Sequence, residues 1–467
     1  MQQQDLSKAT PSRRNVLAGA AALLGGIGAP AAPASKPPNI LYIHSHDSGR
    51  YVSPYGHAIP TPNIQKLASE GVLFRSAFSG APTCSPSRAC LLTGQCAHQN
   101  GMLGLAHRGF ALNDYRHHVL YSLRKAGYYS VLGGLQHIAA KPETIGYDEI
   151  LHHRTLSAVD VAPAAVEYLS RRPKQPFFLD VGFRETHREY PAPTANDNPK
   201  FTTPPRAVPD RPQTRQDMAA YHASARVMDH GVGEVLAALE RNGLAENTLV
   251  INTTDHGIAF PRMKCNLTDD GWGISLIMRG PGGFRGGKNC DALISQLDIF
   301  PTLCELAGVE QPEWLEGKSM LSVIQGRAAT INEEVFAEVN YHAAYEPKRA
   351  VRTARWKYIR RFGGRKTPVL PNCDDSLSKS VWLEYGWKNR ILPEEELYDL
   401  VFDPAEQNNL AETPAYRQAY EEMKGRLDRW MKTTDDPLLR GPVAAPHGAL
   451  VNNPDGTSPK EPTIRVS

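Results

Sequence analysis

The chain of 467 residues lacks any long apolar run after residue 40. A helix that crosses a bilayer needs about 20 mostly apolar residues, so the body of the chain is not expected to span a membrane. It also lacks an excess of one charge sign, because 52 Lys and Arg residues face 49 Asp and Glu residues, for a formal net charge of +3. A global field that binds polyanions is thereby excluded, and any attraction for anions must be local. No internal repeat is visible, which excludes a repeat architecture.

Cysteine is scarce, and its spacing excludes two classes of small domain. There are seven cysteines, an odd number scattered along the chain, so a disulfide framework is not expected. The even six-residue spacing of Cys84, Cys90 and Cys96 is not the Cys-x-x-Cys or Cys/His spacing typical of zinc sites. We interpret Cys90 and Cys96 as packing residues; if Cys84 is set aside, six cysteines remain and up to three bridges stay open. The set is Cys84, Cys90, Cys96, Cys265, Cys290, Cys304 and Cys373.

The N-terminus has the pattern of a targeting segment. Arg13 and Arg14 precede an apolar stretch, residues 18–32, that is rich in Ala and Gly. This arrangement is typical of a twin-arginine export signal, and the stretch is too short and too interrupted by Gly and Pro30 to favour a spanning helix. Small residues at 31–35 offer a cleavage site. We therefore expect export by the twin-arginine translocase, a mature chain that begins near Lys36, and a periplasmic or secreted location without stable membrane insertion.

Strands alternate with helices along most of the chain, which indicates an α/β fold with a mostly parallel sheet and helices on both faces. Expected strands are residues 39–43, 72–78, 128–132, 176–183 and 248–252, and expected helices are 64–70, 121–126 and 216–238. Polar residues follow the ends of these strands, where open α/β sheets place their sites. They are His46, Asp47, His137, His187, Asp255 and His256.

The composition shifts after Gly326. Residues 335–362 are predicted to form two extended runs around a turn at Glu346-Pro347, followed by a strand at 397–400. A helix is expected at 415–432, because its apolar residues recur at helical spacing. The tail after Pro442 is rich in Pro, Gly and Asn, so it is expected to be an irregular wrap or partly disordered.

Residues 84–94 read CSPSRACLLTG and are the most informative run of the chain. Pro86 suits the first turn of a helix, Ser85 or Ser87 can cap it, and residues 89–95 read as helix. Cys84 is therefore expected at a helix N-terminus, where free N–H groups and the helix dipole favour negative charge. Arg88 lies one turn further on and can direct a planar fork of donors at the same anion.

This run matches the signature C-x-P-S-R-x-x-x-[LM]-T-G without a mismatch, and the chain resembles the type I sulfatases over residues 39 to about 435. Residues 84–94, 98–102 and 255–266 carry a closer similarity to the heparan N-sulfatase (N-sulfoglucosamine sulfohydrolase) branch. The resemblance implies an alkaline-phosphatase-like fold, with a large mixed, mostly parallel sheet sandwiched by helices and a small C-terminal antiparallel sheet with a helix. It also implies a division into an export signal (1–35), a catalytic domain (36–326), a C-terminal subdomain (327–440) and a tail (441–467).

In that family the signature cysteine is oxidised to formylglycine by a formylglycine-generating enzyme. The resemblance implies that hydrated formylglycine at position 84 attacks sulfur, takes up the sulfuryl group, and then expels sulfate as the aldehyde re-forms. Sulfate hydrolysis needs such a nucleophile, cations around the oxygens and an acid for the leaving group. The substrate implied is a sulfated carbohydrate, with an N-sulfate or a sulfate ester.

The resemblance also implies a divalent metal ion, usually calcium. Asp47, Cys84 and Asp255 match family metal ligands, and His256 matches a position where the branch has Asn and related enzymes have His. His46 stands where the family normally has Asp. Calcium prefers oxygen ligands, whereas two imidazoles favour manganese, zinc or iron. We expect calcium, with His46 displaced from direct ligation, and retain manganese or zinc as the alternative.

The remaining site residues come from further family positions. His137 matches the histidine that assists formylglycine, but the neighbouring sulfate-binding lysine is replaced by Leu135, and Lys141 or Arg184 are candidates for its role. His187 matches the second histidine, a donor to sulfate or to the leaving group. Lys264 matches a basic residue of the branch. With Cys84 and Arg88, these residues form the expected catalytic set.

Two other readings stay open. The first is a phosphonate monoester or phosphodiester hydrolase of the same superfamily. The second is a non-catalytic glycan-binding protein, which the departures at His46 and Leu135 motivate and the intact signature disfavours. The basic, aromatic run at 352–366 is interpreted as a structural strand with a solvated charged face, and nucleic-acid binding is not expected of an exported chain.

Overall fold

The computed structural model describes residues 36–467, and the predicted export signal lies outside them. Its central feature is an eight-stranded sheet with the order β5-β4-β6-β1-β7-β8-β2-β9. The five strands from β5 to β7 run parallel, and β8 runs antiparallel to both of its neighbours, so the sheet is mixed and mostly parallel, as predicted. The strands are β1 (Asn39–His44), β2 (Val72–Phe74), β4 (Tyr129–Gly134), β5 (Glu149–Ile150), β6 (Phe177–Gly182), β7 (Thr248–Thr253), β8 (Leu276–Arg279) and β9 (Lys288–Cys290).

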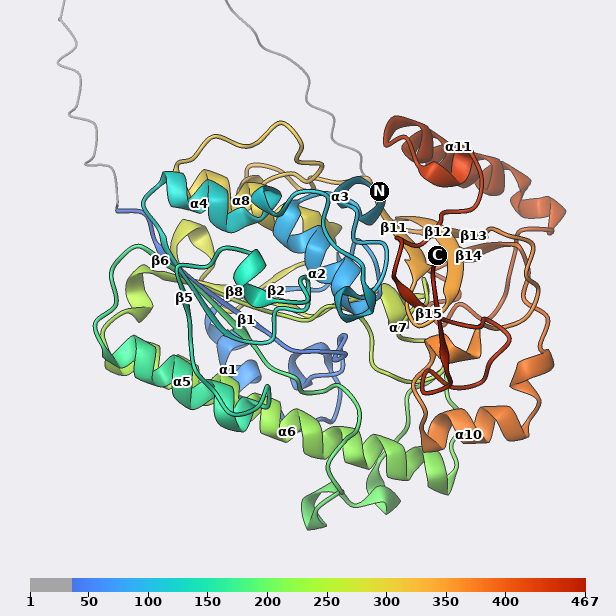
Figure 1. Ribbon diagram of the computed structural model, residues 1–467, viewed down its shortest axis with the longest axis horizontal. Helices are drawn as coiled ribbons and strands as arrows, with labels where there is room; N and C mark the ends of the chain where they lie inside the picture. Colours follow the sequence, from blue (N-terminus) through green and yellow to red (C-terminus); the bar gives the residue numbers. More distant parts are fainter. Residues whose placement is uncertain (1–35) are drawn as a thin grey trace, which may run out of the picture. The chain divides into compact units, whose positions relative to one another are not determined.

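Helices cover both faces of this sheet (Figure 1). Ile40 and Tyr42 of β1 pack with α2, α4 and α8 on one face, whereas Leu41 and Ile43 pack with α1, α5 and α6 on the other. This alternation is the consequence of the two-residue period of a strand that is buried on both sides. The helices are α1 (Pro62–Glu70), α2 (Cys84–Thr93), α3 (Ala97–Asn100), α4 (Val119–Lys125), α5 (Ala158–Ser170), α6 (Pro212–Arg241), α7 (Asp269–Trp272), α8 (Ile299–Ala307) and α9 (Leu321–Ile324).

Two local predictions in this part of the chain are wrong. Helix α2 begins at Cys84 rather than at Ala89, and neither serine caps it: Thr83 is the N-cap residue, without a side-chain hydrogen bond. Ser87 instead donates to the backbone oxygen of Asp255, which ties the helix to the end of β7. The run 72–78 is two strands rather than one, because the chain turns after β2 and β3 (Ala77–Phe78) pairs with β10 (Ile294–Ser295) in a separate sheet.

A second, antiparallel sheet follows in the C-terminal part, with the order β11-β12-β13-β14. The turn predicted at Glu346-Pro347 is wrong, because both residues lie inside β12 and the chain reverses at residues 342–344. Pro347 is tolerated there because the β11–β12 register shifts next to it, between Val339 and Tyr341. The elements are β11 (Glu334–Tyr341), β12 (Tyr345–Thr353), β13 (Trp356–Arg361), α10 (Leu377–Glu384), β14 (Glu395–Asp399) and α11 (Arg417–Thr433).

The basic run of β12 and β13 is held by carboxylates of the protein itself. Arg352 pairs with Asp269 at 3.1 Å, Arg355 with Asp399 at 2.7 Å, and Arg361 with Glu396 at 2.6 Å. These ion pairs support the structural interpretation of the run, since little free positive charge is left on it.

A buried polar network, called the Arg349 cluster below, joins this sheet to the rest of the chain. Arg349 binds Asp436 through two hydrogen bonds, of 2.6 and 2.9 Å, and lies 3.3 Å from Glu338. Glu338 accepts from the backbone N–H of His98 and lies 2.9 Å from its Nδ1. Asn340 completes the cluster, since its amide donates to Glu338 and its oxygen accepts from Arg349. The carboxylates and the guanidinium therefore satisfy each other without solvent.

The tail is ordered as a wrap that ends in a small two-stranded sheet, β15 (Leu450–Asn452) and β16 (Thr463–Arg465). Arg108 donates to Asn452 at 2.8 Å, and Lys460 pairs with Glu189, so the tail contacts segments that border the sheet edge. In residues 36–467, no helix combines the length and apolar character that a bilayer crossing requires. Residues Pro37–Ser467 form one unit, and the division predicted at residue 326 stays a prediction.

Candidate active site

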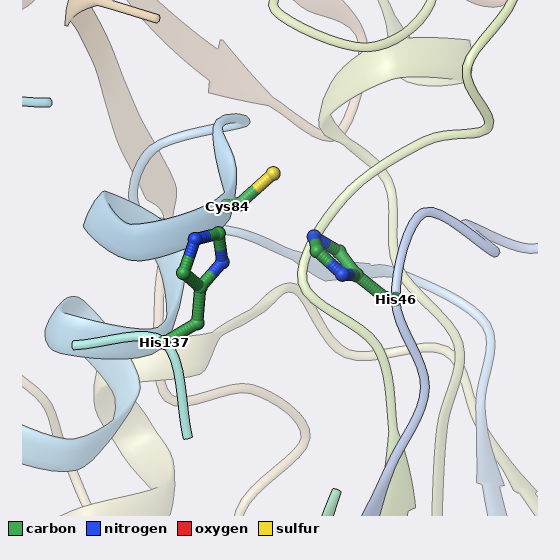
Figure 2. Close-up of side chains that lie close together, drawn as sticks. All are labelled: His46, Cys84 and His137. Atoms are coloured by element: carbon green, nitrogen blue, oxygen red, sulfur yellow. The ribbon is translucent and has the colours of Figure 1, made fainter. Parts of the chain in front are cut away.

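The polar residues predicted at the strand ends come together at one edge of the large sheet. His46 and Asp47 follow β1, Asp255 and His256 follow β7, His187 follows β6, and His137 follows β4. These four strands are neighbours, in the order β4-β6-β1-β7, and they are parallel, so their carboxyl ends meet. Figure 2 shows His46 and His137 on either side of Cys84, which is at the start of α2.

Two carboxylates and two imidazoles, called the His-Asp cluster below, converge beside Cys84. His46 Nε2 lies 3.5 Å from Asp47 Oδ1 and 3.4 Å from Asp255 Oδ2. His256 Nε2 lies 3.3 Å from the same oxygen of Asp47 and 3.8 Å from Asp255 Oδ2. The backbone N–H groups of Asp47 and His256 both donate to Asp255 Oδ1, which fixes the orientation of that carboxylate.

The protonation states of this cluster suit metal binding. Burial, and then the charges of His187 and Arg88, hold the pKa of His46 well below its ordinary value, so its imidazole is neutral. Burial alone would raise the pKa of Asp255, but His256 and Arg88 outweigh it and the pKa is lowered. His46 Nε2 is buried and has no hydrogen-bond partner among residues 36–467. A neutral nitrogen and two carboxylates that face one point fit a divalent cation.

Cys84 lies against this cluster and is only 1% exposed. Its Sγ is 3.4 Å from His256 Nε2 and 3.8 Å from Asp47 Oδ1. Burial raises the pKa of the thiol well above its ordinary value, and the two nearby carboxylates raise it further, against the lowering effect of Lys264. The residue is therefore a protonated thiol and not an activated thiolate. Cysteine as encoded is a poor nucleophile here, which fits a residue that acts only after conversion.

Arg88 is held by a chain of buried side chains. Its Nη2 donates to Asp255 Oδ2 at 3.0 Å and to the backbone oxygen of Ser45 at 2.9 Å, and its Nη1 contacts His44 Nδ1. His44 Nε2 in turn lies 2.9 Å from Asp180 Oδ1, and Tyr147 donates to the other oxygen of Asp180. The guanidinium fork expected to face an anion is thus bound to the protein, and only Nε lacks a partner within residues 36–467. Because Arg88 donates to Nδ1, the His44 proton must be on Nε2, where Asp180 accepts it.

Lys264 bridges two carboxylates. Its Nζ lies 2.8 Å from Asp47 Oδ2 and 3.0 Å from Asp374 Oδ2. Burial alone would lower the pKa of Lys264, but Asp374 and Asp47 outweigh it and raise the pKa well above its ordinary value. Lys264 is therefore a permanent cation at the His-Asp cluster.

Histidines line the opening of the site. The His187 side chain is 30% exposed, and its Nε2 lies 3.9 Å from Asp47 Oδ2. Its ring centroid lies 4.5 Å from that of His46. His137 Nε2 lies 3.0 Å from Nδ1 of the exposed His107, and the two rings stack. The candidates for the missing lysine, Lys141 and Arg184, are both exposed, and within residues 36–467 neither side chain forms a hydrogen bond or ion pair with this group of residues; Arg184 contacts His187 through the backbone alone.

All nine predicted site residues therefore meet, and four further residues join them that the sequence did not single out. Two contact predicted site residues: His44 lies behind Arg88, and Asp374 lies beside Lys264. His107 stacks on His137, and burial and then the charge of Lys264 hold the pKa of His342 well below its ordinary value; His342 Nδ1 is buried without a partner in the described residues. Asp374 and His342 come from the C-terminal part, which therefore helps to build the site.

Comparisons with known proteins agree with this geometry. The family model "Sulfatase" matches residues 38–309, and the model "N-sulphoglucosamine sulphohydrolase, C-terminal" matches residues 262–368. N-sulphoglucosamine sulphohydrolase of Homo sapiens is 30% identical over 483 residues, which cover 89% of this chain and 93% of that protein. An ulvan-active sulfatase of Formosa agariphila is 28% identical over 498 residues, which cover 92% of this chain and 80% of the relative.

Solved structures share the fold. The structure of a 2-O GAG sulfatase superposes with a TM-score of 0.67 at 22% sequence identity, covering 88% of this chain and 95% of the other. The predicted architecture, a large mixed sheet between helices with a small antiparallel sheet after it, is thereby confirmed.

Proposed function

The chain belongs to the sulfatase family and is a sulfuric ester hydrolase, and from this premise we propose that it removes sulfate groups from a sulfated sugar or polysaccharide through formylglycine at position 84. The observation that carries the proposal is the position of Cys84: a buried, protonated cysteine at the N-terminus of α2, within 4 Å of Asp47 and His256. The relatives are named for N-sulphoglucosamine and for ulvan, which supports a carbohydrate substrate without choosing between an N-sulfate and a sulfate ester.

The residues around position 84 have distinct proposed roles. A hydrated formylglycine would supply a hydroxyl that attacks sulfur and a second hydroxyl whose deprotonation releases sulfate. Arg88 and Lys264 hold the carboxylates of Asp255 and Asp47 in place and add positive charge where the sulfuryl oxygens gather. His137 lies near Cys84 and would move the formylglycine proton. His187, at the opening, would donate to the leaving group.

A divalent metal ion would be held by Asp47, Asp255 and His256 and would supply Lewis acidity at position 84. The sequence favoured calcium with His46 displaced, but His46 Nε2 is as close to both carboxylates as His256 Nε2 is. This placement supports the alternative, manganese or zinc, because imidazole nitrogen suits those ions better than calcium.

The choice of metal is tested by ion content. We expect the isolated protein to bind manganese or zinc more tightly than calcium in calorimetric titrations, and His46→Asp to shift the preference towards calcium. Wild-type protein that retains only calcium after dialysis against a mixture of these ions would contradict this assignment.

The decisive experiment on function joins mass and turnover. Protein co-produced with a formylglycine-generating enzyme is digested with trypsin, and the peptide from Ser76 to Arg88 is weighed; we expect the Cys84 thiol to be replaced by an aldehyde. The same protein is assayed on an aryl sulfate, N-sulfoglucosamine and an aryl phosphodiester. We expect sulfate release to dominate, whereas an unmodified thiol, or a preference for the phosphodiester, would contradict the proposal. Export, conversion of Cys84 and the division at residue 326 remain part of this proposal.

A further inference from the structure

An aromatic groove lies beside α10, outside the residues that surround Cys84. It has a volume of about 610 Å³ and runs between α10 with the turn after it and the segment that leads into α6. Figure 1 shows α10 next to α6, below the small sheet of the tail. The lining residues that matter are Trp382, Tyr385, Trp387, Asn389, Arg211 and Arg390.

The aromatic side chains of the groove are only partly packed away: Trp382 and Trp387 are half-buried and Tyr385 is exposed. Tyr385 is 70% exposed. Trp382 and Trp387 meet edge to face with centroids 5.1 Å apart, so their ring planes form a corner. The indole nitrogen of Trp382 is buried and has no partner in the described part of the chain. Exposed aromatic clusters of this kind mark binding sites, because the ring faces offer apolar area and the N–H and O–H groups offer polar contacts.

The charge of the groove has one sign. Two guanidinium groups line it, Arg211 and Arg390, and no carboxylate does. Arg390 forms no ion pair within residues 36–467, unlike Arg352, Arg355 and Arg361 on the nearby strands, each of which has a carboxylate partner. A free, planar guanidinium group binds tetrahedral oxyanions through paired N–H donors. The groove therefore suits a ligand with apolar ring faces and anionic groups.

We propose that this groove is an accessory binding site for a sulfated oligosaccharide, the polymeric form of the substrate. Sugar rings present C–H faces that pack on Trp382 and Trp387, while sulfate groups pair with Arg390 and Arg211. The inference rests on the proposed function for the identity of its ligand. It adds a site, separate from position 84, at which a sulfated chain is held.

The segment that leads into α10 contacts the His-Asp cluster. Asp374 pairs with Lys264 at the His-Asp cluster, and α10 begins three residues later, at Leu377. Three extended steps and the helical rise to Trp382 separate the two Cα atoms by at most about 18 Å. An oligosaccharide of a few units is longer than this separation of Asp374 and Trp382, so the proposed sulfated chain would extend from the groove towards the His-Asp cluster.

The test separates binding from turnover. Binding of a heparin-derived hexasaccharide is measured calorimetrically with Cys84→Ala protein, and again with Arg390→Gln or Trp387→Ala added. We expect each added change to weaken binding at least tenfold, and the unsulfated counterpart to bind at least tenfold more weakly than the sulfated form. Phe402→Ala is the matched control, because Phe402 is an exposed aromatic residue outside the groove.

Turnover provides the second arm. In converted enzyme, Arg390→Gln is expected to raise KM for the sulfated oligosaccharide about tenfold and to leave kcat and KM for an aryl sulfate unchanged. Arg390 is exposed, so its replacement preserves the fold, which circular dichroism checks. Hexasaccharide affinity that is unchanged in both groove variants would overturn the inference. It would also be overturned if Cys84→Ala protein bound anionic vesicles as tightly as the hexasaccharide. Failure of the converted wild type to release sulfate would instead overturn the proposed function. The calorimetric binding measurements would still test the groove in that case.

Discussion

The Arg349 cluster and the His-Asp cluster are both buried and both charged, but they are built in opposite ways. In the Arg349 cluster each carboxylate faces the guanidinium or an imidazole, and Asn340 takes up the remaining oxygen and N–H. In the His-Asp cluster the two carboxylates lie beside two imidazoles, those of His46 and His256. His46 Nε2 has no hydrogen-bond partner in residues 36–467. Buried polar groups are otherwise almost always satisfied. The first cluster is complete as it stands, whereas the unpaired nitrogen of the second supports the proposed metal ion.

The largest expected effect separates the two clusters by activity. Cys84→Ala is expected to lower kcat by about 10⁴-fold or more relative to the converted wild type, because it removes the proposed nucleophile. The free energy of unfolding, measured in urea against the unconverted wild type, should change little, since only one buried sulfur atom is lost. Cys90→Ala, a buried cysteine in the same helix, is the control and should keep its activity. Comparable loss in both variants would show that α2 had been disturbed rather than the chemistry.

The reverse experiment is Arg349→Leu. Loss of one partner from a buried ion pair leaves Asp436 and Glu338 uncompensated, so the free energy of unfolding should fall by about 3–5 kcal/mol. Denaturation in urea measures this loss. The converted protein that remains folded should retain the wild-type kcat. A lowered kcat with unchanged stability would mean that the two clusters are not separate in function.

The pH dependence of stability should show that the charges of the Arg349 cluster stabilise the fold. Burial alone would raise the pKa of Glu338, but His98 and Arg349 outweigh it and hold the pKa at about 2, below the ordinary 4.5. A depressed carboxylate pKa stabilises the fold fully above pH 4.5, and this stabilisation is lost as the pH falls towards 2. Glu338→Gln should therefore cost a few kcal/mol at pH 7 and progressively less between pH 4.5 and 2, measured by urea denaturation at each pH. A loss of unfolding free energy that stays constant with pH would contradict this. The control is Glu384→Gln, at an exposed residue, which should change the free energy of unfolding little at any pH.

The smallest effect concerns the chain of side chains behind Arg88. Asp180→Ala removes the acceptor that keeps the His44 proton on Nε2, so His44 can turn a second donor towards Arg88. Loss of such a supporting contact typically costs about 10–100-fold in activity, and we expect it in kcat with KM unchanged. Tyr147→Phe, one bond further away, should cost less. A rise in KM alone would indicate that Asp180 acts on substrate binding and not on the position of Arg88.

The sequence predicted one of the two clusters and not the other, for a physical reason. His46, Asp47, Asp255 and His256 follow short apolar runs, and the rule that parallel strands end at one edge brings them together. Glu338, Arg349 and Asp436 lie in segments whose pairing depends on tertiary contacts, and nothing in their local pattern separates a buried charge from a solvated one. The turn predicted at Glu346-Pro347 was wrong because a register shift between β11 and β12 accommodates Pro347 inside a strand.

Asp374, His342, His107 and His44 were missed for the same reason. Asp374 and His342 lie in irregular segments and His107 lies in a single turn of 3-10 helix, so none of the three shows a periodic pattern, and they reach the site only through packing. His44 lies in a strand with every residue buried, where a histidine reads as core. The sequence pattern gave no sign that His44 contacts a site residue whereas Tyr42, two residues before it, is part of the core.

The order of strands in the large sheet also determines when the sheet can form during synthesis of the chain. Strand β1 pairs with β6 and β7, which end at Gly182 and Thr253, so neither partner exists while residues 84–94 leave the ribosome. Some 160 further residues must be synthesised before the sheet can close over Cys84, a delay of about 8–30 s at roughly 5–20 residues per second. After closure the thiol is 1% exposed. If Cys84 is converted as proposed, the strand order sets how long the modifying enzyme would have access to it during synthesis.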